Sequence, residues 1–295
     1  MTRTDGTARV ATTQRYSLAE GVLWDDATGD VVWVDIHAGL VLRGDRSLHE
    51  RTRTPVDSTV GAVAFAADGG LLVAAHRGLA TIAPDGTISL GPDLLTSIPA
   101  ARLNDGAVDP QGRYLVGSTT ENTNTGHEVL LRVSPDGSVE TLRRGLTLSN
   151  GIGWSPDGST IYHVDTFAKT VSSHPYDASS DWDPAGWVTL LDEFAGYPDG
   201  LAVDASGDLW VAIWGGGVVQ RFAASGAYLA SVDVGTPQVS CPGFIGDGLL
   251  AITTSSDDTE GDPLAGALLL CDVAAMAQPT ARWAGSTTTP YWRTA

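Results

Sequence analysis

One pattern recurs in Leu18-Ala-Glu-Gly21-Val-Leu-Trp24, Asn104-Asp-Gly106-Ala-Val-Asp109, Ser149-Asn-Gly151-Ile-Gly-Trp154 and Pro198-Asp-Gly200-Leu-Ala-Val-Asp204. Each segment places a polar residue before a glycine and a short apolar run after it. Two further segments, Thr59-Val-Gly61-Ala-Val-Ala-Phe65 and Cys241-Pro-Gly243-Phe-Ile245, keep the glycine and the apolar residues. The six glycines are 40, 45, 45, 49 and 43 residues apart, which indicates a structural repeat.

Several strand-like runs follow one another within each repeat. Turn pairs such as Asp68-Gly69 and Asp136-Gly137 separate runs rich in Val, Ile, Leu, Thr and Trp. The second run of each repeat covers 30–36, 70–75, 113–118, 160–165, 208–213 and 248–254. A period near 45 residues with about four strands is typical of propeller blades. We therefore predict an all-β, six-bladed β-propeller with four antiparallel strands per blade; a two-sheet sandwich, the alternative, lacks such a repeat.

The repeat fills nearly the whole chain. Residues 1–295 are therefore expected to form a single propeller domain. Residues 8–14, which precede the first repeat, are expected to supply the outer strand of the last blade and so close the ring. Closure of this kind would cover a sheet edge that is otherwise exposed.

The composition restricts the class of protein. The 295 residues include 35 Asp and Glu against 17 Lys and Arg, a formal net charge of −18, which argues against nucleic acid or anionic membranes as partners. The longest apolar run, 265–277, is interrupted by Asp272 and is too short to span a bilayer. Residues 1–6 lack the apolar core of a secretory signal, so we expect a cytoplasmic protein. We expect a monomer or weak homo-oligomer, with Cys241 and Cys271 as buried free thiols.

Polar residues precede the aligned glycine in four of the six repeats. The first strand of each blade lines the central channel of a propeller. The residues before the glycines should therefore surround one axis; they are Glu20, Val60, Asp105, Asn150, Asp199 and Pro242. Carboxylates gathered near one axis repel one another unless a cation compensates them. Their oxygens suit Ca²⁺, Mg²⁺ or Mn²⁺, and no Cys or His stands at these six positions to favour structural zinc.

We therefore predict that Glu20, Asn150 and Asp199 bind one divalent cation. The alternative is that these side chains only make turn hydrogen bonds beside a glycine. In the third repeat, Arg102 and Asn104 precede the glycine and are candidates for substrate binding, although Arg102 could equally hold its loop through a salt bridge. The long polar connection 118–127 adds Glu121 and Asn122 as candidates for contacts with sugar hydroxyls.

These motifs together resemble the SMP-30/gluconolactonase/regucalcin family. The resemblance runs through Ala19-Glu-Gly-Val-Leu-Trp24, Arg102-Leu-Asn-Asp-Gly-Ala-Val-Asp-Pro-Gln-Gly-Arg-Tyr114, Ser149-Asn-Gly151 and Pro198-Asp-Gly-Leu-Ala-Val-Asp204, in the family's order. It implies a six-bladed propeller with one catalytic divalent cation held by Glu20, Asn150 and Asp199. It also implies substrate contacts from Arg102 and Asn104, and aligns a sugar-contacting glutamate with either Glu121 or Asn122. The segment Cys241-Pro-Gly-Phe-Ile-Gly246 departs from the family pattern.

The resulting expectation is a metal-dependent, gluconolactonase-like lactonase that hydrolyses a sugar lactone to its aldonic acid. Asp199 would act as the general base toward water. The cofactor would be one divalent ion, with Ca²⁺, Zn²⁺, Mg²⁺ and Mn²⁺ all open. Two alternatives keep the same propeller: a metal-dependent phosphotriesterase or esterase, and a non-catalytic calcium-binding protein.

Overall fold

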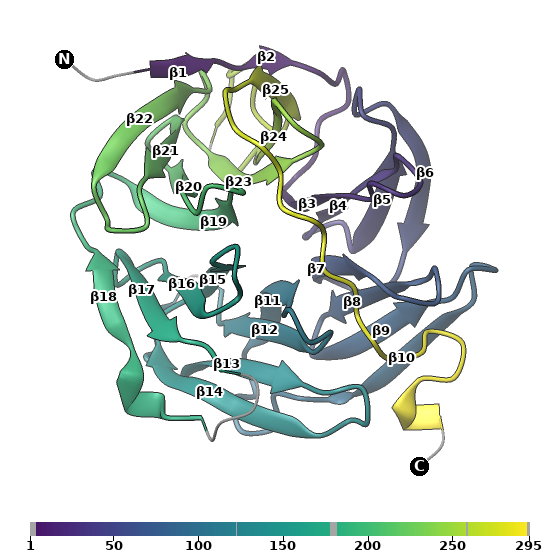
Figure 1. Ribbon diagram of the computed structural model, residues 1–295. Coiled ribbons are helices and arrows are strands. Elements are labelled where there is room, and N and C mark those ends of the chain that lie inside the picture. The colour runs from purple at the N-terminus through teal and green to yellow at the C-terminus, as the bar shows by residue number, and fades with distance from the viewer. Residues whose placement is uncertain (1–3, 122, 178–181, 258, 294–295) are drawn as a thin grey trace.

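Six antiparallel sheets surround a central axis in the computed structural model of this protein (Figure 1). The structure describes residues 4–121, 123–177, 182–257 and 259–293, so Asn122 lies outside the described residues. Each sheet has four antiparallel strands, and one of them carries a fifth strand at its outer edge. The prediction of a six-bladed β-propeller with four antiparallel strands per blade is confirmed.

Within each blade, consecutive strands run from the axis to the rim. The innermost strands are β3 (Ala19–Trp24), β7 (Val60–Phe65), β11 (Arg102–Val108), β15 (Ser149–Trp154), β19 (Tyr197–Val203) and β23 (Val239–Phe244). The second strands are β4 (Val31–Asp35), β8 (Leu71–Ala75), β12 (Tyr114–Thr119), β16 (Thr160–Asp165), β20 (Leu209–Trp214) and β24 (Leu249–Thr254). The third strands are β5 (Leu40–Gly44), β9 (Gly78–Ile82), β13 (Glu128–Val133), β17 (Thr170–Pro175), β21 (Val218–Phe222) and β25 (Leu269–Asp272). The outer strands of blades one to five are β6 (Glu50–Pro55), β10 (Ile88–Asp93), β14 (Val139–Leu146), β18 (Val188–Leu191) and β22 (Tyr228–Asp233).

The N-terminal segment closes the ring. Strand β2 (Arg9–Val10) pairs antiparallel with β25 and becomes the outer strand of the sixth blade, as predicted, although it is shorter than 8–14. Strand β1 (Thr4–Thr7) pairs parallel with β22 and extends the fifth blade, which the sequence did not predict. One short stretch of chain therefore joins two neighbouring blades.

The repeated glycines let neighbouring innermost strands pack closely. A β-carbon at Gly200 of β19 would lie 2.7 Å from Cα of Cys241 on β23. At Gly151 of β15 it would lie 2.7 Å from the carbonyl oxygen of Asp199. Real β-carbons do not approach other atoms so closely, so these positions exclude larger residues. At four of the six repeat positions the glycine thus reflects the narrow spacing of the strands around the axis. The exceptions are Gly21, whose φ is +58°, and Gly106, where a β-carbon would meet the ring of Tyr114.

Apolar side chains fill the space between blades. Trp210 and Ala212 of β20 pack with Leu250 and Ile252 of β24, and all four are buried. Burial of one large apolar side chain stabilises a fold by about 1.5–3 kcal/mol. The blades therefore form a rigid frame whose channel-facing strands hold their side chains in fixed positions.

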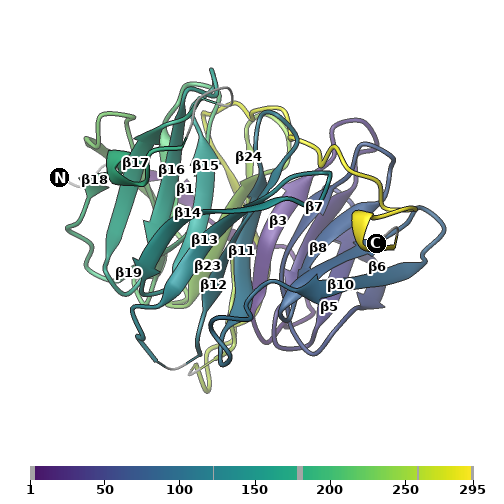
Figure 2. The same cartoon turned by 90° about the horizontal axis from the view of Figure 1, so that it is seen from below.

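The C-terminal segment crosses the propeller face at which the innermost strands end (yellow in Figure 1 and Figure 2). We call residues 277–284 the rear strap, this end of the channel its rear end, and the end at which the innermost strands begin its front end. The strap is hydrogen-bonded to all six blades, through Trp24, Phe65, Gly112, Trp154, Val203 and Asp247. In the described part of the chain the helices are two 3₁₀ turns, η1 (Pro184–Gly186) and η2 (Tyr291–Arg293), and none could cross a membrane.

Candidate metal and substrate site

The three predicted metal ligands lie together at the front end of the channel. Asn150 donates hydrogen bonds from Nδ2 to Oδ1 of Asp199 and, over 3.1 Å, to Oγ1 of Thr166. Thr166 in turn donates to the carbonyl oxygen of Pro198 over 2.8 Å. Glu20, Asn150 and Asp199 are all buried. The structure therefore brings together side chains that are up to 179 residues apart in the chain (199 − 20).

The pKa values of the three carboxylates at this end of the channel are raised. The pKa of Glu20 is well above its usual value because of burial, and because Asp199 and Asp105 are close. Burial and the Asp105 carboxylate likewise raise the pKa of Asp199 well above its usual value. Burial raises the pKa of Asp105 to about 6. Three acidic groups therefore share one poorly solvated region, which costs free energy when all three are ionised.

The chemistry of these donors fits a divalent cation. Two carboxylates and an amide provide oxygen ligands, which Ca²⁺, Mg²⁺ and Mn²⁺ prefer. A cation would also offset the repulsion among Glu20, Asp105 and Asp199. Over the described ranges, no group of three His, Cys, Asp or Glu side chains is arranged to hold a metal, so the amide of Asn150 is needed to complete the set.

The sixth blade departs from the predicted ring. Pro242 pairs regularly with Ile252, whereas the register irregularity of β23 lies earlier, between Val239 and Cys241. The thiol of Cys241 donates to the carbonyl oxygen of Pro242 over 3.5 Å and lies close to the Glu20 carboxylate. Burial and three nearby carboxylates raise the pKa of this thiol. Both cysteines are buried and free, as predicted.

Arg102 links the candidate substrate residues. Its Nη1 donates to Oδ1 of Asn104 over 2.8 Å, and its Nε donates to Oε1 of Glu121 over 2.8 Å. Asn104 donates from Nδ2 to the carbonyl oxygen of Ser149 over 3.0 Å, next to Asn150. Arg102 and Asn104 are buried, whereas about half of the Glu121 side chain is exposed. Arg102 thus forms the salt bridge that the sequence suggested as the alternative to substrate binding. The same salt bridge holds Glu121 beside Arg102 and Asn104.

Two rim residues that the sequence did not single out as functional, His37 and Asp257, continue from Glu121 along the front rim. His37, on the turn after β4, has Nε2 3.8 Å from Oε1 of Glu121 and Nδ1 3.5 Å from Oδ2 of Asp257. These three residues come from blades one, three and six. Their turns carry no shared motif, so only the spatial arrangement could reveal them. The front rim is therefore acidic, with one imidazole between two carboxylates.

The comparisons with known proteins cover most of the chain. Residues 18–256 match the family described as SMP-30/Gluconolactonase/LRE-like region. The chain is 32% identical to pentonolactonase XacC of Haloferax volcanii over 90% of this chain and 94% of the relative. It is 31% identical to L-arabinolactonase of Azospirillum brasilense over 95% and 97% of the two chains. The solved structure of regucalcin, a calcium-binding protein from Agrobacterium tumefaciens, superposes with a TM-score of 0.88 at 26% identity, covering 96% of this chain and 99% of that one. This protein belongs to the SMP-30/gluconolactonase/LRE-like family.

Proposed function

We propose that this protein is a metal-dependent lactonase that hydrolyses a neutral sugar lactone to the corresponding aldonic acid. The observation that carries the proposal is the contact of Asn150 with Asp199 in a region that also contains Glu20 and the Arg102–Asn104 pair. The relatives named pentonolactonase and L-arabinolactonase, which the chain matches over nearly its full length, support a lactone as the substrate class. Such proteins hydrolyse cyclic carboxylic esters.

The residues of the site divide into two groups. Glu20, Asn150 and Asp199 would hold the divalent cation, and Thr166 fixes the amide of Asn150. Arg102 and Asn104 would orient the sugar hydroxyls, because their polar groups are already held in place by Glu121 and Ser149. Prior fixation of this kind lowers the entropy that is lost on binding. When bound, the cation would supply Lewis-acid polarisation of an ester carbonyl.

The proton balance of the hydrolysis gives Asp199 its role. The water oxygen forms a bond to the carbonyl carbon, and the ring carbon–oxygen bond breaks. Asp199 would accept the proton from water and return it to the departing ring oxygen, which becomes a hydroxyl group. The products are then one hydroxy acid and an unchanged Asp199.

The proposal is tested by stripping the protein of metal with a chelator and adding back Ca²⁺, Mg²⁺, Mn²⁺ or Zn²⁺ one at a time. Acid release from arabinono-, xylono- and gluconolactone is then followed with a pH indicator, beside paraoxon as a non-lactone ester. At least one lactone should be hydrolysed only after metal is restored. Asp199→Ala and Asn150→Ala should abolish this turnover while the circular dichroism spectrum is unchanged.

Asn124→Ala is the matched control, because Asn124 is exposed and belongs to the polar connection near the front rim. It should retain most of the activity. Full activity of the chelated protein would refute metal dependence. Hydrolysis of paraoxon but of none of the lactones would favour an esterase, and stabilisation by Ca²⁺ without any turnover would favour a calcium-binding protein.

A further inference from the structure

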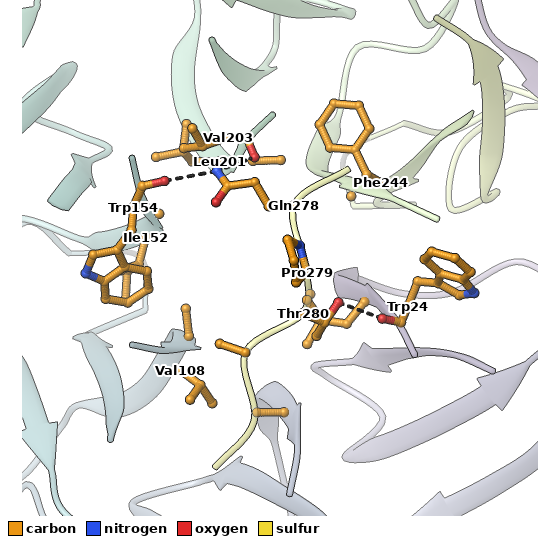
Figure 3. A pocket seen from close by; sticks show the side chains of 18 of the residues that line it. Trp24, Val108, Ile152, Trp154, Leu201, Val203, Phe244, Gln278, Pro279 and Thr280 are labelled. Atoms are coloured by element: carbon orange, nitrogen blue, oxygen red, sulfur yellow. Dashed lines mark hydrogen bonds between the residues drawn. The ribbon is translucent and has the colours of Figure 1, made fainter. Parts of the chain in front are cut away.

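A cavity lies behind the candidate site, between Asp105 and the rear strap. Its volume is about 440 Å³, within the range that small-molecule pockets occupy. Trp154 and Ile152 lie on one side of it, and Phe244 and Trp24 on the other (Figure 3). Gln278, Pro279 and Thr280 of the rear strap cross between them. We call this cavity the rear chamber.

The walls of the rear chamber are mainly apolar. The innermost strands supply Trp24, Val108, Ile152, Trp154, Leu201 and Phe244, near the ends of β3, β11, β15, β19 and β23. Gln278 does not offer its amide protons to the chamber, because Nε2 donates to the carbonyl oxygens of Trp154, Val203 and Asp204. Such walls favour the hydrocarbon part of a ligand.

The charged side chains that line the described part of the rear chamber are all carboxylates. Asp105 lies at its inner end, beside Glu20 and Asp199, and Asp157 lies at its outer edge on the turn between β15 and β16. Hydrogen bonds from Ser155 and Ser159 hold the Asp157 carboxylate and lower its pKa to about 2. Among the described residues that line the chamber, no Lys, Arg or His offsets these carboxylates. The chamber is therefore complementary to a cation.

We propose that the rear chamber binds a small organic cation, a protonated amine attached to an aromatic or branched aliphatic group. The ammonium group points toward Asp105, where hydrogen-bond acceptors and negative charge are available. The apolar group lies against Ile152, Trp154 and Phe244. This ligand is distinct from the lactone, which is expected at the front end with Arg102 and Asn104. The chamber thus forms a second binding site in the same channel.

The test compares three probes that share a phenylethyl group and differ in the charge of its terminal group: phenethylamine, 2-phenylethanol and 3-phenylpropanoate. Binding to the metal-loaded protein is measured by isothermal titration calorimetry near neutral pH and by the change in total tryptophan fluorescence. The protonated amine should bind about tenfold more tightly than the alcohol, and the carboxylate should bind more weakly still. Equal affinities for the amine and the alcohol would overturn the proposal, as would the absence of binding by the amine.

Val108→Phe places a larger side chain in the chamber and should weaken amine binding about tenfold. Val139→Phe is the matched control, because Val139 lies exposed on the outer strand of the same blade. If the Val108 variant bound the amine as well as the Val139 variant did, the amine would sit elsewhere and the assignment to the chamber would be wrong. Asp157 is exposed, so Asp157→Asn should leave the fold intact. This substitution should weaken the binding of phenethylamine and leave the binding of 2-phenylethanol unchanged. Equal weakening of both probes would contradict the charge argument.

Discussion

Arg102 and Glu121 form an ion pair, with 2.8 Å between Nε and Oε1, although they belong to β11 and to the loop after β12. The same guanidinium group also donates to Asn104 and to the carbonyl oxygen of Leu103. Burial lowers the pKa of Arg102, and the neighbouring Glu121 carboxylate opposes this effect. A planar group with several donors can serve all these partners at once, which an ammonium group cannot do.

Arg102→Lys should therefore impair turnover mainly through substrate binding. The ammonium group cannot hold Asn104 and Glu121 simultaneously, so we expect kcat/KM for the preferred lactone to fall about tenfold to hundredfold, or ~1.4–2.8 kcal/mol. Steady-state kinetics should show this loss mostly in KM. Arg144→Lys is the control, because Arg144 is exposed. Unchanged KM in the Arg102 variant would remove this residue from the substrate site.

Stabilisation by Ca²⁺ should increase with pH. In the metal-free protein the folded-state pKa values of Glu20, Asp105 and Asp199 lie above their unfolded values. Each group therefore contributes stability below its unfolded pKa that is lost as pH rises through its folded pKa. A bound cation would offset this loss, since it favours the ionised carboxylates. Melting temperatures with and without Ca²⁺ should differ more at about pH 8 than at about pH 5. A gain that is constant across this interval would argue against a cation beside these groups.

The acidic front rim should weaken the binding of lactones that carry a negative charge. Asp257 and Glu121 flank His37, and a lactone with a phosphate or sulfonate substituent would meet both carboxylates. Asp257→Asn should raise kcat/KM for a 6-phospho lactone about threefold to tenfold at low salt, and leave neutral lactones unchanged. Asp136 is exposed on the β13–β14 turn, so Asp136→Asn should change kcat/KM for neither the 6-phospho lactone nor the neutral lactones. An equal increase for charged and neutral substrates would show that Asp257 does not act through charge.

The rear strap should contribute measurably to stability through one amide group. Nε2 of Gln278 donates to three carbonyl oxygens over 3.1, 3.0 and 3.2 Å. Gln278→Ala would leave these acceptors without that donor and should lower the free energy of unfolding by about 1–3 kcal/mol. Gln278→Glu should be at least as harmful, because a carboxylate faces carbonyl oxygens. Urea titration of both variants measures this, and a Glu variant as stable as the parent would refute the assigned contacts.

Much of the fold could be predicted because its strongest determinants are local. The glycine before each apolar run, and the strand 160–165, appear in the structure as the sequence indicated. Strand β1 could not be predicted, since its polar residues carry no alternating pattern and its partner lies more than 200 residues away. The rear strap could not be predicted for a related reason. Its hydrogen bonds to the blades do not form a regular strand pairing, so its sequence has no alternating pattern.

The candidate site was predictable where one motif fixed one position. Glu20, Asn150 and Asp199 stand at the repeated position before the glycine, and Arg102 and Asn104 belong to the motif of the third repeat. All five lie at one end of the channel. Cys241 was missed because alignment on Gly243 assumes the register of the other blades, whereas the irregularity of β23 comes earlier. His37 and Asp257 were missed because turns from different blades meet only after the ring has closed.

The pairing of Arg9 with Leu270 also sets an order of events during synthesis on the ribosome. The partner residue of Arg9 follows it by 261 residues (270 − 9 = 261), so β2 stays unpaired while those residues are being synthesised. Contacts so remote in sequence are slow to form, and the unsatisfied strand is open to aggregation in the interval. Blade six therefore gains its outer strand only after β25 has been synthesised, and the ring of blades closes at that stage.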